Sequence, residues 1–308
     1  MKEFRIYYPW PDFPSLSMSG NGCILKCDHC LGKYLSYMQN ASMPEKLLSL
    51  AEKFYSEGKK GYLLSGGCDL DGKMLNLNKI LPAVKKTIDE YDFIVKLHTG
   101  FLNYKDAENI VSSGVQIASM EMLSSSESIE RVYHLSASAK DYLNTFLNLE
   151  KAGMPYITPH IVIGLPYSNR SEFQSIDFLK DLKISTLSLV VFRPTKGTIF
   201  EKTPLIMPEY FSEVAHHARS SFSGKIILAA LRPRESEWWS KKDIVSRIEI
   251  EAIDNGLDGI EVPGKTALEY IRNNFHVRRI RSFGVLPVEM EGAVNFEVTK
   301  QTEKSRSL

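Results

Sequence analysis

Short apolar runs alternate with longer segments of helical periodicity along most of this sequence, and that alternation limits the possible folds more than any other feature. The runs are rich in β-branched residues, which predicts buried strands. They cover residues 16–19, 61–65, 93–98, 115–120, 156–163, 186–192, 225–231 and 259–262. Strands that alternate with helices pair in parallel, because each intervening helix carries the chain back to the same end of the sheet.

Eight strands with eight crossover segments predict an α/β fold of the (β/α)8 TIM-barrel type, with an open doubly wound sheet as the alternative. The barrel would span residues 15–264. An aromatic, proline-rich N-terminal extension at 1–14 would precede it, and a short C-terminal extension at 265–308 would follow it. The last ~10 residues are polar, which predicts disorder at that end.

Local signals mark several individual elements. Three helices carry N-terminal capping signals. These are Ser42 with Glu45, Ser138 with Asp141, and Ser171 with Gln174. In the C-terminal extension, a short helix is predicted at 267–273. It is followed by a basic run, Arg278, Arg279 and Arg281.

Charge and cysteine content narrow the functional classes. Lysine plus arginine number 38 and aspartate plus glutamate 37, so the balance does not favour nucleic acid as a partner. No apolar run approaches the roughly 20 residues that a membrane helix needs, and no secretion signal stands at the start. Four cysteines in 308 residues do not form a disulfide framework. A soluble protein in a reducing, cytoplasmic setting, without a membrane partner, is therefore expected.

Three of the four cysteines lie in the stretch "SGNGCILKCDHCLGKY", residues 19–34. Cys23, Cys27 and Cys30 follow the first predicted strand, on a loop at the face where barrel enzymes place their active sites. A structural zinc site needs four ligands, usually two separated C-x2-C pairs, and no second pair exists here. A redox C-x-x-C motif would leave Cys23 unexplained. An iron–sulfur cluster fits better, since three thiolates leave one of four irons open to another ligand.

The spacing C-x3-C-x2-C resembles the signature of the radical S-adenosylmethionine (SAM) superfamily, and the likeness extends over residues 15–263. The resemblance implies a [4Fe-4S] cluster on the three cysteines, with SAM bound at the open iron. Reductive cleavage of SAM would then give a 5′-deoxyadenosyl radical that abstracts hydrogen from an unactivated carbon. It also implies an electron donor such as ferredoxin or flavodoxin.

The same resemblance assigns further residues to SAM. His29 holds the position of an aromatic ring near the adenine, and "SGGCD" corresponds to a glycine-rich motif near the methionine amino group. The strand ends "ASMEM" and "PHIVIGLP" correspond to ribose and adenine contacts. The implied cofactor-binding residues are His29, Ser65, Gly66, Gly67, Cys68, Ser119, Glu121, Ile163 and Gly164. Each motif also has a purely structural explanation. The glycines of "SGGCD" could form a turn that requires positive φ, "ASMEM" could be an ordinary strand end, and His160 could be a core histidine.

Basic side chains follow the sixth and seventh predicted strands. Arg193 and Lys196 lie in "FRPTKGT", and Arg232 and Arg234 lie in "LRPRE". Such groups at a barrel mouth are candidates for binding an anionic part of the substrate. Solvated surface loops explain these basic residues equally well.

Several of these segments together resemble the biotin-synthase-related branch that includes a two-component lipoyl synthase. That likeness implies a transferase that inserts sulfur into a carrier-bound octanoyl group, with a paralogous radical SAM subunit and an acyl-carrying protein as partners. Sulfur insertion needs a sulfur source, usually a second iron–sulfur cluster, and only Cys68 remains for one. Three possibilities follow from this shortage of cysteines. A second cluster could be shared with a partner subunit, non-cysteine ligands could complete it, or the protein could carry out a radical SAM reaction on another small molecule without inserting sulfur. A non-catalytic iron–sulfur protein is the remaining alternative.

Overall fold

The computed structural model describes residues 2–237 and 241–299, so the C-terminal end that the sequence predicts to be disordered lies outside the described residues. The strands are β1 (Glu3–Tyr7), β2 (Ser15–Ser17), β3 (Gln39–Asn40), β4 (Gly61–Ser65), β5 (Ile94–His98), β6 (Ile117–Ser119), β7 (Tyr156–Ile157), β8 (His160–Ile163), β9 (Thr186–Val191), β10 (Lys225–Leu228), β11 (Gly259–Glu261), β12 (His276–Ile280) and β13 (Phe296–Thr299). The helices are α1 (Pro44–Ser56), α2 (Leu77–Tyr91), α3 (Tyr104–Ser112), α4 (Ser126–Arg131), α5 (Ala139–Lys151), α6 (Glu172–Asp177), α7 (Pro208–Ser221), α8 (Lys242–Asp254) and α9 (Lys265–Asn274), with 3₁₀ turns at Lys33–Tyr37 and Val288–Ala293.

The strands form two sheets that meet between β7 and β8. One sheet has the order β3-β2-β4-β5-β6-β7, and the other has the order β13-β12-β1-β11-β10-β9-β8. A parallel bridge from Glu121 to His160 links β8 to the strand end after β6. The amide of Met122 donates to the His160 carbonyl at 2.9 Å. Together the two sheets make a β/α barrel in which the β12–β13 pair is antiparallel, and the predicted fold class is confirmed.

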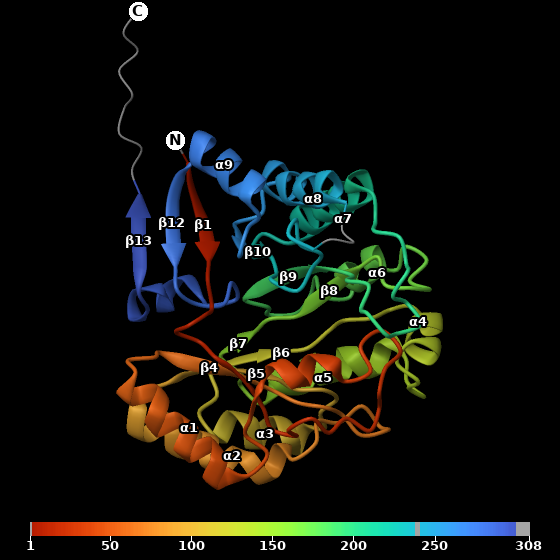
Figure 1. Cartoon of the computed structure of the whole chain (residues 1–308). Coiled ribbons are helices and arrows are strands. Elements are labelled where there is room, and N and C mark those ends of the chain that lie inside the picture. Colours follow the sequence, from red (N-terminus) through yellow and green to blue (C-terminus); the bar gives the residue numbers. More distant parts are fainter. Residues whose placement is uncertain (1, 238–240, 300–308) are drawn as a thin grey trace, which may run out of the picture.

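Helices cover the outside of both sheets. Figure 1 shows α1, α2 and α3 along the outer side of one sheet and α7, α8 and α9 along the outer side of the other. The apolar face of α1 buries Leu47, Ala51 and Phe54, as its helical period requires. A second apolar cluster combines barrel strands with the C-terminal segment, for example Ile94 and Ile117 with Phe283. The C-terminal segment therefore fills part of the barrel interior.

Each of the eight predicted strand regions contains a strand at nearly the predicted position. The predicted strand at 156–163 is divided into β7 and β8, and the short helix at 267–273 is α9. The capping box at Ser138 and Asp141 is present. The other two capping predictions are wrong: α1 begins after Met43 with Pro44 in its first turn, and Ser171 makes no side-chain cap.

The segment before residue 15 contributes β1, which lies between β11 and β12 inside the seven-stranded sheet. This strand was not predicted from the sequence because prolines and aromatic residues dominate the N-terminal stretch. Within it, however, Phe4, Ile6 and Tyr7 are buried. Among the described residues, no helix is both long and apolar enough to cross a membrane.

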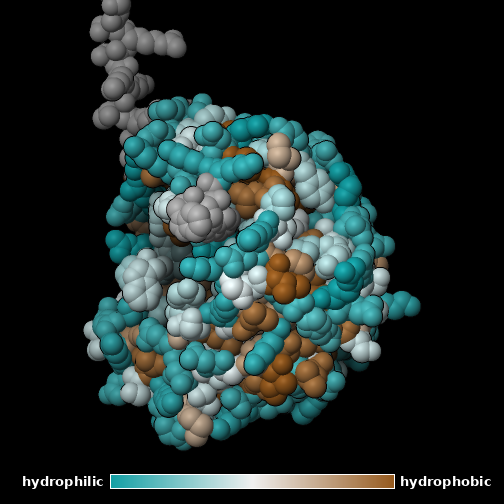
Figure 2. Space-filling model, turned by 45° about the vertical axis from the view of Figure 1, so that its right-hand side comes forward, coloured by the Kyte–Doolittle hydropathy of each residue, from teal (hydrophilic) through white to brown (hydrophobic). Residues whose placement is uncertain are grey.

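The surface shown in Figure 2 is mostly hydrophilic, with apolar residues gathered in the centre and lower part of this face. Large apolar side chains are exposed in loops that follow barrel strands. They include Ile24 after β2, Leu70 after β4 and Ile199 after β9. The ends of the parallel strands are therefore bordered partly by apolar side chains.

Candidate active site

The three clustered cysteines lie on an irregular loop between β2 and the 3₁₀ turn at Lys33–Tyr37. Cys27 is buried, while Cys23 and Cys30 are half-buried. The amides of Cys30 and Leu31 donate to the Cys27 carbonyl at 3.1 and 2.8 Å, so the loop turns tightly at the C-x2-C pair. Lys26 and Leu31 have φ values of 46° and 50°. Left-handed conformations at residues with side chains store strain, which is typical of functional loops.

The surroundings of the loop lower the pKa of one cysteine, which favours its thiolate form. A hydrogen bond from Cys27 lowers the pKa of Cys30, and the neighbouring His29 supports the same shift. The reciprocal bond to Cys30, with burial, raises the pKa of Cys27. Thiolates are the form of cysteine that binds metal centres.

The donor set fits a cluster better than a single ion. Among the described residues, no group of three or more His, Cys, Asp or Glu side chains is arranged to hold one metal ion. Three cysteines on one turn, with further sulfur nearby at Cys68, match the thiolate chemistry of an iron–sulfur cluster. Cys23, Cys27 and Cys30 therefore fit as the residues that would hold it.

Cys68 belongs to the same region rather than to a separate site. Its carbonyl accepts hydrogen bonds from the amides of Ile24 and Leu25 at 2.9 and 3.0 Å. Burial raises the pKa of the Cys68 thiol to about 12, and Cys23 and Cys30 act on it electrostatically. The backbone of this residue holds the cysteine loop in place, while its half-buried side chain is a neutral thiol.

Gly66 and Gly67 are needed for close packing, not for a left-handed turn, since neither has a positive φ. A Cβ at Gly67 would lie 2.2 Å from the Gly22 carbonyl oxygen and 2.5 Å from Cα of Cys23. A Cβ at Gly66 would lie 3.0 Å from Sδ of Met74. The missing side chain at Gly67 thus lets the cysteine loop pack directly on the end of β4.

We expect Gly67→Ala to displace the cysteine loop, because its Cβ would meet backbone atoms that have no flexible alternative position. Overpacking of this kind costs about 1–3 kcal/mol of stability, and the iron content after anaerobic reconstitution should fall with it. The control is Gly292→Ala, whose Cβ would meet nothing within 4 Å. A Gly67→Ala protein with full iron content and unchanged unfolding free energy would contradict this account.

His29 and Glu121 present two buried polar atoms without partners on the same side of the cysteine loop. The His29 ring lies 4.9 Å from the Tyr133 ring, and the Tyr133 hydroxyl donates to Oε2 of Glu121. Nδ1 of His29 and Oε1 of Glu121 have no hydrogen-bond partner among the described residues. Burial raises the pKa of Glu121 to about 6. Buried polar atoms without partners indicate a site that a ligand completes.

Residues 131–135, with the sequence "RVYHL", explain this arrangement, although none of them was assigned to the site from the sequence. The Asp28 amide donates to the Val132 carbonyl at 2.9 Å, and Nε2 of His134 lies 3.0 Å from Oδ1 of Asp28. Tyr133 is thereby held against His29. An aromatic residue among charged ones just after α4 was the available signal.

Other residues assigned to SAM have different surroundings. Ser119 donates its hydroxyl hydrogen to the Thr158 carbonyl at 2.7 Å, so it serves the backbone between β6 and β7. The Ile163 side chain is fully buried and alternates to the strand face opposite His160. Gly164 has φ 81°, and its amide donates to Glu172. In the structure Ser119 and the Ile163 side chain are thus engaged in contacts within the protein.

Arg193 and Lys196 lie on the loop after β9, where the Arg193 side chain is paired and Lys196 contacts the cysteine-loop side through its backbone. The Arg193 guanidinium forms an ion pair with Glu237. The Lys196 side chain is exposed, and its carbonyl accepts from Nζ of Lys33 at 2.6 Å. The Tyr34 hydroxyl is 2.7 Å from Oγ1 of Thr195, so this loop closes over the 3₁₀ turn that follows the cysteines.

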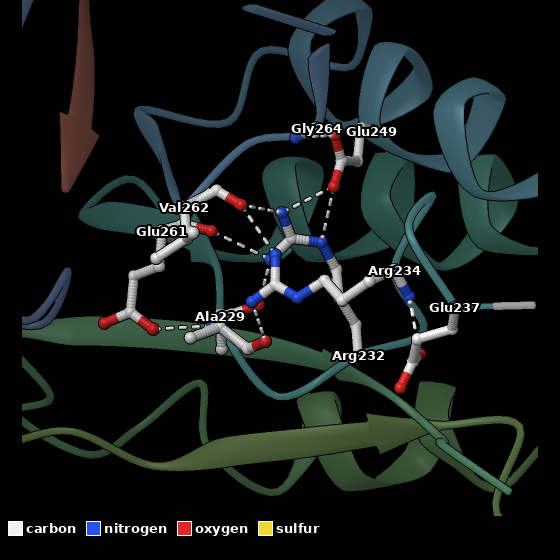
Figure 3. Close-up of polar contacts among 9 residues, drawn as sticks. Ala229, Arg232, Arg234, Glu237, Glu249, Glu261, Val262 and Gly264 are labelled. Carbon is white, nitrogen blue, oxygen red and sulfur yellow. Dashed lines mark hydrogen bonds and ion pairs between the residues drawn. The ribbon is translucent and has the colours of Figure 1, made fainter. Parts of the chain in front are cut away.

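Arg232 is a structural residue rather than a substrate ligand. It is 1% exposed and bonds Oε1 of Glu249 through Nε and Nη2 at 2.9 and 2.6 Å. Its other hydrogen bonds go to the carbonyls of Ala229, Glu261 and Val262 (Figure 3). All five guanidinium donors therefore face protein acceptors, and the expectation that Arg232 binds substrate is wrong.

Arg234 lies beside Arg232 and is also turned toward the backbone. It donates to the Val262 carbonyl at 2.6 Å and to the Ala230 carbonyl. Burial and the neighbouring Arg232 lower its pKa to about 10. Figure 3 shows both arginines between the β10 end and the chain after β11. Their common role is to join these two strand ends.

The comparisons with known proteins agree with this geometry. A family model of the radical SAM superfamily matches residues 17–179, just over half of the chain. The chain belongs to this superfamily. No curated protein matches the sequence.

Solved structures show the same fold at low sequence identity. They include HydG, a maturase of the [FeFe]-hydrogenase, with a TM-score of 0.60 and 16% identity over 84% of this chain and 57% of that chain. Methylornithine synthase (PylB) has a TM-score of 0.55 and 12% identity over 84% of this chain and 72% of that chain. SuiB of Streptococcus suis has a TM-score of 0.52 and 11% identity over 91% of this chain and 58% of that chain. This chain thus spans little more than half of the HydG chain.

Membership defines the chemical class. Radical SAM proteins are enzymes that use a [4Fe-4S] cluster and SAM, and they need an electron donor. When bound, the cluster supplies the electron that cleaves SAM by a radical mechanism. The cysteine loop, the packed glycines and the unpartnered His29 and Glu121 atoms are consistent with that cofactor pair.

Proposed function

We propose that this protein uses Cys23, Cys27 and Cys30 to hold the cluster and abstracts hydrogen from an unactivated carbon of a small polar molecule, without inserting sulfur. The packing of the cysteine loop on Gly67 and Cys68 carries the first part of the proposal. Cys27 is buried there and Cys30 is poised as a thiolate. The loop therefore offers three cysteine sulfurs from one turn, and these would bind the cluster as thiolates.

We assign His29 and Glu121 to SAM. Glu121 offers an unpartnered carboxylate oxygen, and a carboxylate suits hydroxyl groups such as those of a ribose. His29 offers a ring beside Tyr133 for a flat base. Ser65, Gly66 and Gly67 bring backbone at the end of β4 to the same loop. Ferredoxin or flavodoxin remains the proposed electron donor.

Two observations favour a reaction without sulfur insertion over the lipoyl-type alternative. The fourth cysteine, Cys68, sits next to the other three, so it does not mark a separate place for a sulfur-donating cluster. The interior side of the barrel also carries Lys96, His98 and His160. These groups suit a polar substrate better than an octanoyl chain.

The test is anaerobic reconstitution with iron and sulfide, followed by dithionite and SAM. The wild-type protein should bind about four irons per chain and release 5′-deoxyadenosine and methionine. A fully loaded protein that forms no 5′-deoxyadenosine would refute the proposal. An iron content that doubles on addition of a paralogous radical SAM subunit would restore the lipoyl-type alternative.

A further inference from the structure

Strand β5 carries a lysine and a histidine on the face that points into the barrel. Ile94, Lys96 and His98 alternate onto one face, and Ile94 belongs to the interior cluster that contains Phe283. The His98 ring lies 5.6 Å from the His160 ring of β8. Lys96 acts electrostatically on both imidazoles. Two barrel strands thus bring one ammonium and two imidazoles together inside the fold.

This group adjoins the cofactor site. Nδ1 of His98 lies 3.5 Å from Oγ of Ser65, and Ser65 immediately precedes Gly66 and Gly67. At the other end, Nζ of Lys96 lies 5.7 Å from the centre of the Phe283 ring. Inside the barrel, His98 and His160 therefore lie between the cofactor site and Lys96, and Lys96 contacts the Phe283 ring.

The Lys96 ammonium has no hydrogen bond or ion pair with any of the described residues. Glu261 acts on it electrostatically, but both oxygens of that carboxylate accept backbone amides. Oε2 accepts from Ala230 at 2.6 Å, and Oε1 accepts from Gly284. Burial lowers the pKa of Lys96. A buried charge without a partner is costly, and an anionic ligand would remove that cost.

The histidines are neutral and leave one ring nitrogen available. Burial lowers the pKa of His160 to about 3. Because Ser119 uses its hydrogen on Thr158, the 3.4 Å contact between Ser119 and Nδ1 of His160 requires that Nδ1 carries the proton. Nε2 of His160 is then a hydrogen-bond acceptor. Lys96, His98 and His160 each keep some accessible surface at these interior positions, so space adjoins them.

We infer that Lys96 anchors a carboxylate of the substrate, and that His160 accepts a hydrogen bond from a hydroxyl or amino group of the same molecule. This rests on the proposed function and names its substrate class, a small carboxylic acid with a hydrogen-bond donor. A carboxylate is preferred to a phosphate because the single Lys96 ammonium balances one negative charge, whereas a phosphate ester carries about −1.5 to −2 at pH 7. The acid would lie between the cysteine loop and Phe283.

Ligand-free stability gives the first test. Lys96→Met removes an unpaired buried charge, so the melting temperature should rise by about 3 °C, as is common when a functional group is removed. Lys96→Gln, which keeps a polar end, should not fall below the wild type. Lys79→Met, an exposed lysine on α2, should cause no shift. A lower melting temperature for both Lys96 variants would overturn the inference.

The pH dependence follows from the sign of the shift. Because the folded protein holds the pKa of Lys96 below its unfolded value, the unfolded chain binds more protons between the two values. Wild-type stability should therefore rise with pH toward that of Lys96→Met. A gap that widens with pH would contradict an unpaired buried ammonium.

Acetate is the ligand probe, with acetamide as its neutral isostere and inorganic phosphate as the competing anion, all at equal ionic strength. Acetate should raise the melting temperature of the wild type but not of Lys96→Met, and acetamide should do neither. Equal stabilisation of both proteins by acetate, or a larger effect of phosphate, would overturn the carboxylate assignment. The measurement needs no SAM chemistry. If the wild-type protein cleaves SAM but is not stabilised by acetate, this inference alone is refuted. If acetate stabilises the wild-type protein but SAM is not cleaved, only the proposed function is refuted.

Discussion

Cys27→Ala should bind almost no iron after reconstitution and should form no measurable 5′-deoxyadenosine. Cys27 is the buried member of the triad and bonds Cys30, so its loss removes one thiolate and perturbs a second. The effect should exceed the about 100-fold loss that removal of an outer partner of a metal ligand causes. Iron analysis, visible absorbance and product assay after anaerobic reconstitution measure it.

Cys68→Ala is the matched control, because it removes a neighbouring thiol and leaves the backbone bonds. The Cys68 carbonyl, which holds the amides of Ile24 and Leu25, is kept in this variant. We expect about four irons per chain and SAM cleavage within a few-fold of the wild type. If Cys68→Ala loses the cluster while Cys27→Ala retains it, the assignment of the three ligands is wrong.

Most strands of the barrel were predictable because they are buried on both faces and read as apolar runs. In β9, for example, Leu187 and Leu189 on one face and Ser188 and Val190 on the other are all buried. Strand β12, which lies between β1 and the edge strand β13, was not predictable in this way. Its arginines read as a basic run, yet Nε of Arg278 lies 3.4 Å from Glu291 and its guanidinium lies over the Phe296 ring. Those partners are set by tertiary packing.

The cysteine site was predictable from spacing, whereas the surroundings of the arginines were not. Arg193 and Arg232 occupy similar positions after neighbouring strands. The first is part-exposed and paired with Glu237, and the second is enclosed with Glu249. The sequence shows a basic residue at a strand end but does not show which distant carboxylate will meet it. Lys96 is the opposite case, since its burial became visible only in the folded chain.

Arg232→Met should lower the free energy of unfolding by about 3–5 kcal/mol, because it leaves Glu249 as an unpaired buried carboxylate. Three backbone carbonyls also lose their donors, so the hydrogen bonds that join the end of β10 to the chain after β11 are lost. Urea denaturation measures the loss. Arg247→Met is the matched control on the same helix as Glu249, since the Arg247–Glu209 pair is exposed on both sides and should contribute under about 1 kcal/mol.

The double variant Arg232→Met/Glu249→Gln separates the charge from the packing. Glutamine removes the buried negative charge but can still accept the Gly264 amide, as Oε2 of Glu249 does at 2.7 Å. The double variant should therefore recover about 2 kcal/mol relative to Arg232→Met, a coupling expected of a buried pair. If Arg232→Met is as stable as the wild type, the guanidinium is not committed to Glu249. It would then be available to a substrate anion, as its position after the seventh strand first suggested.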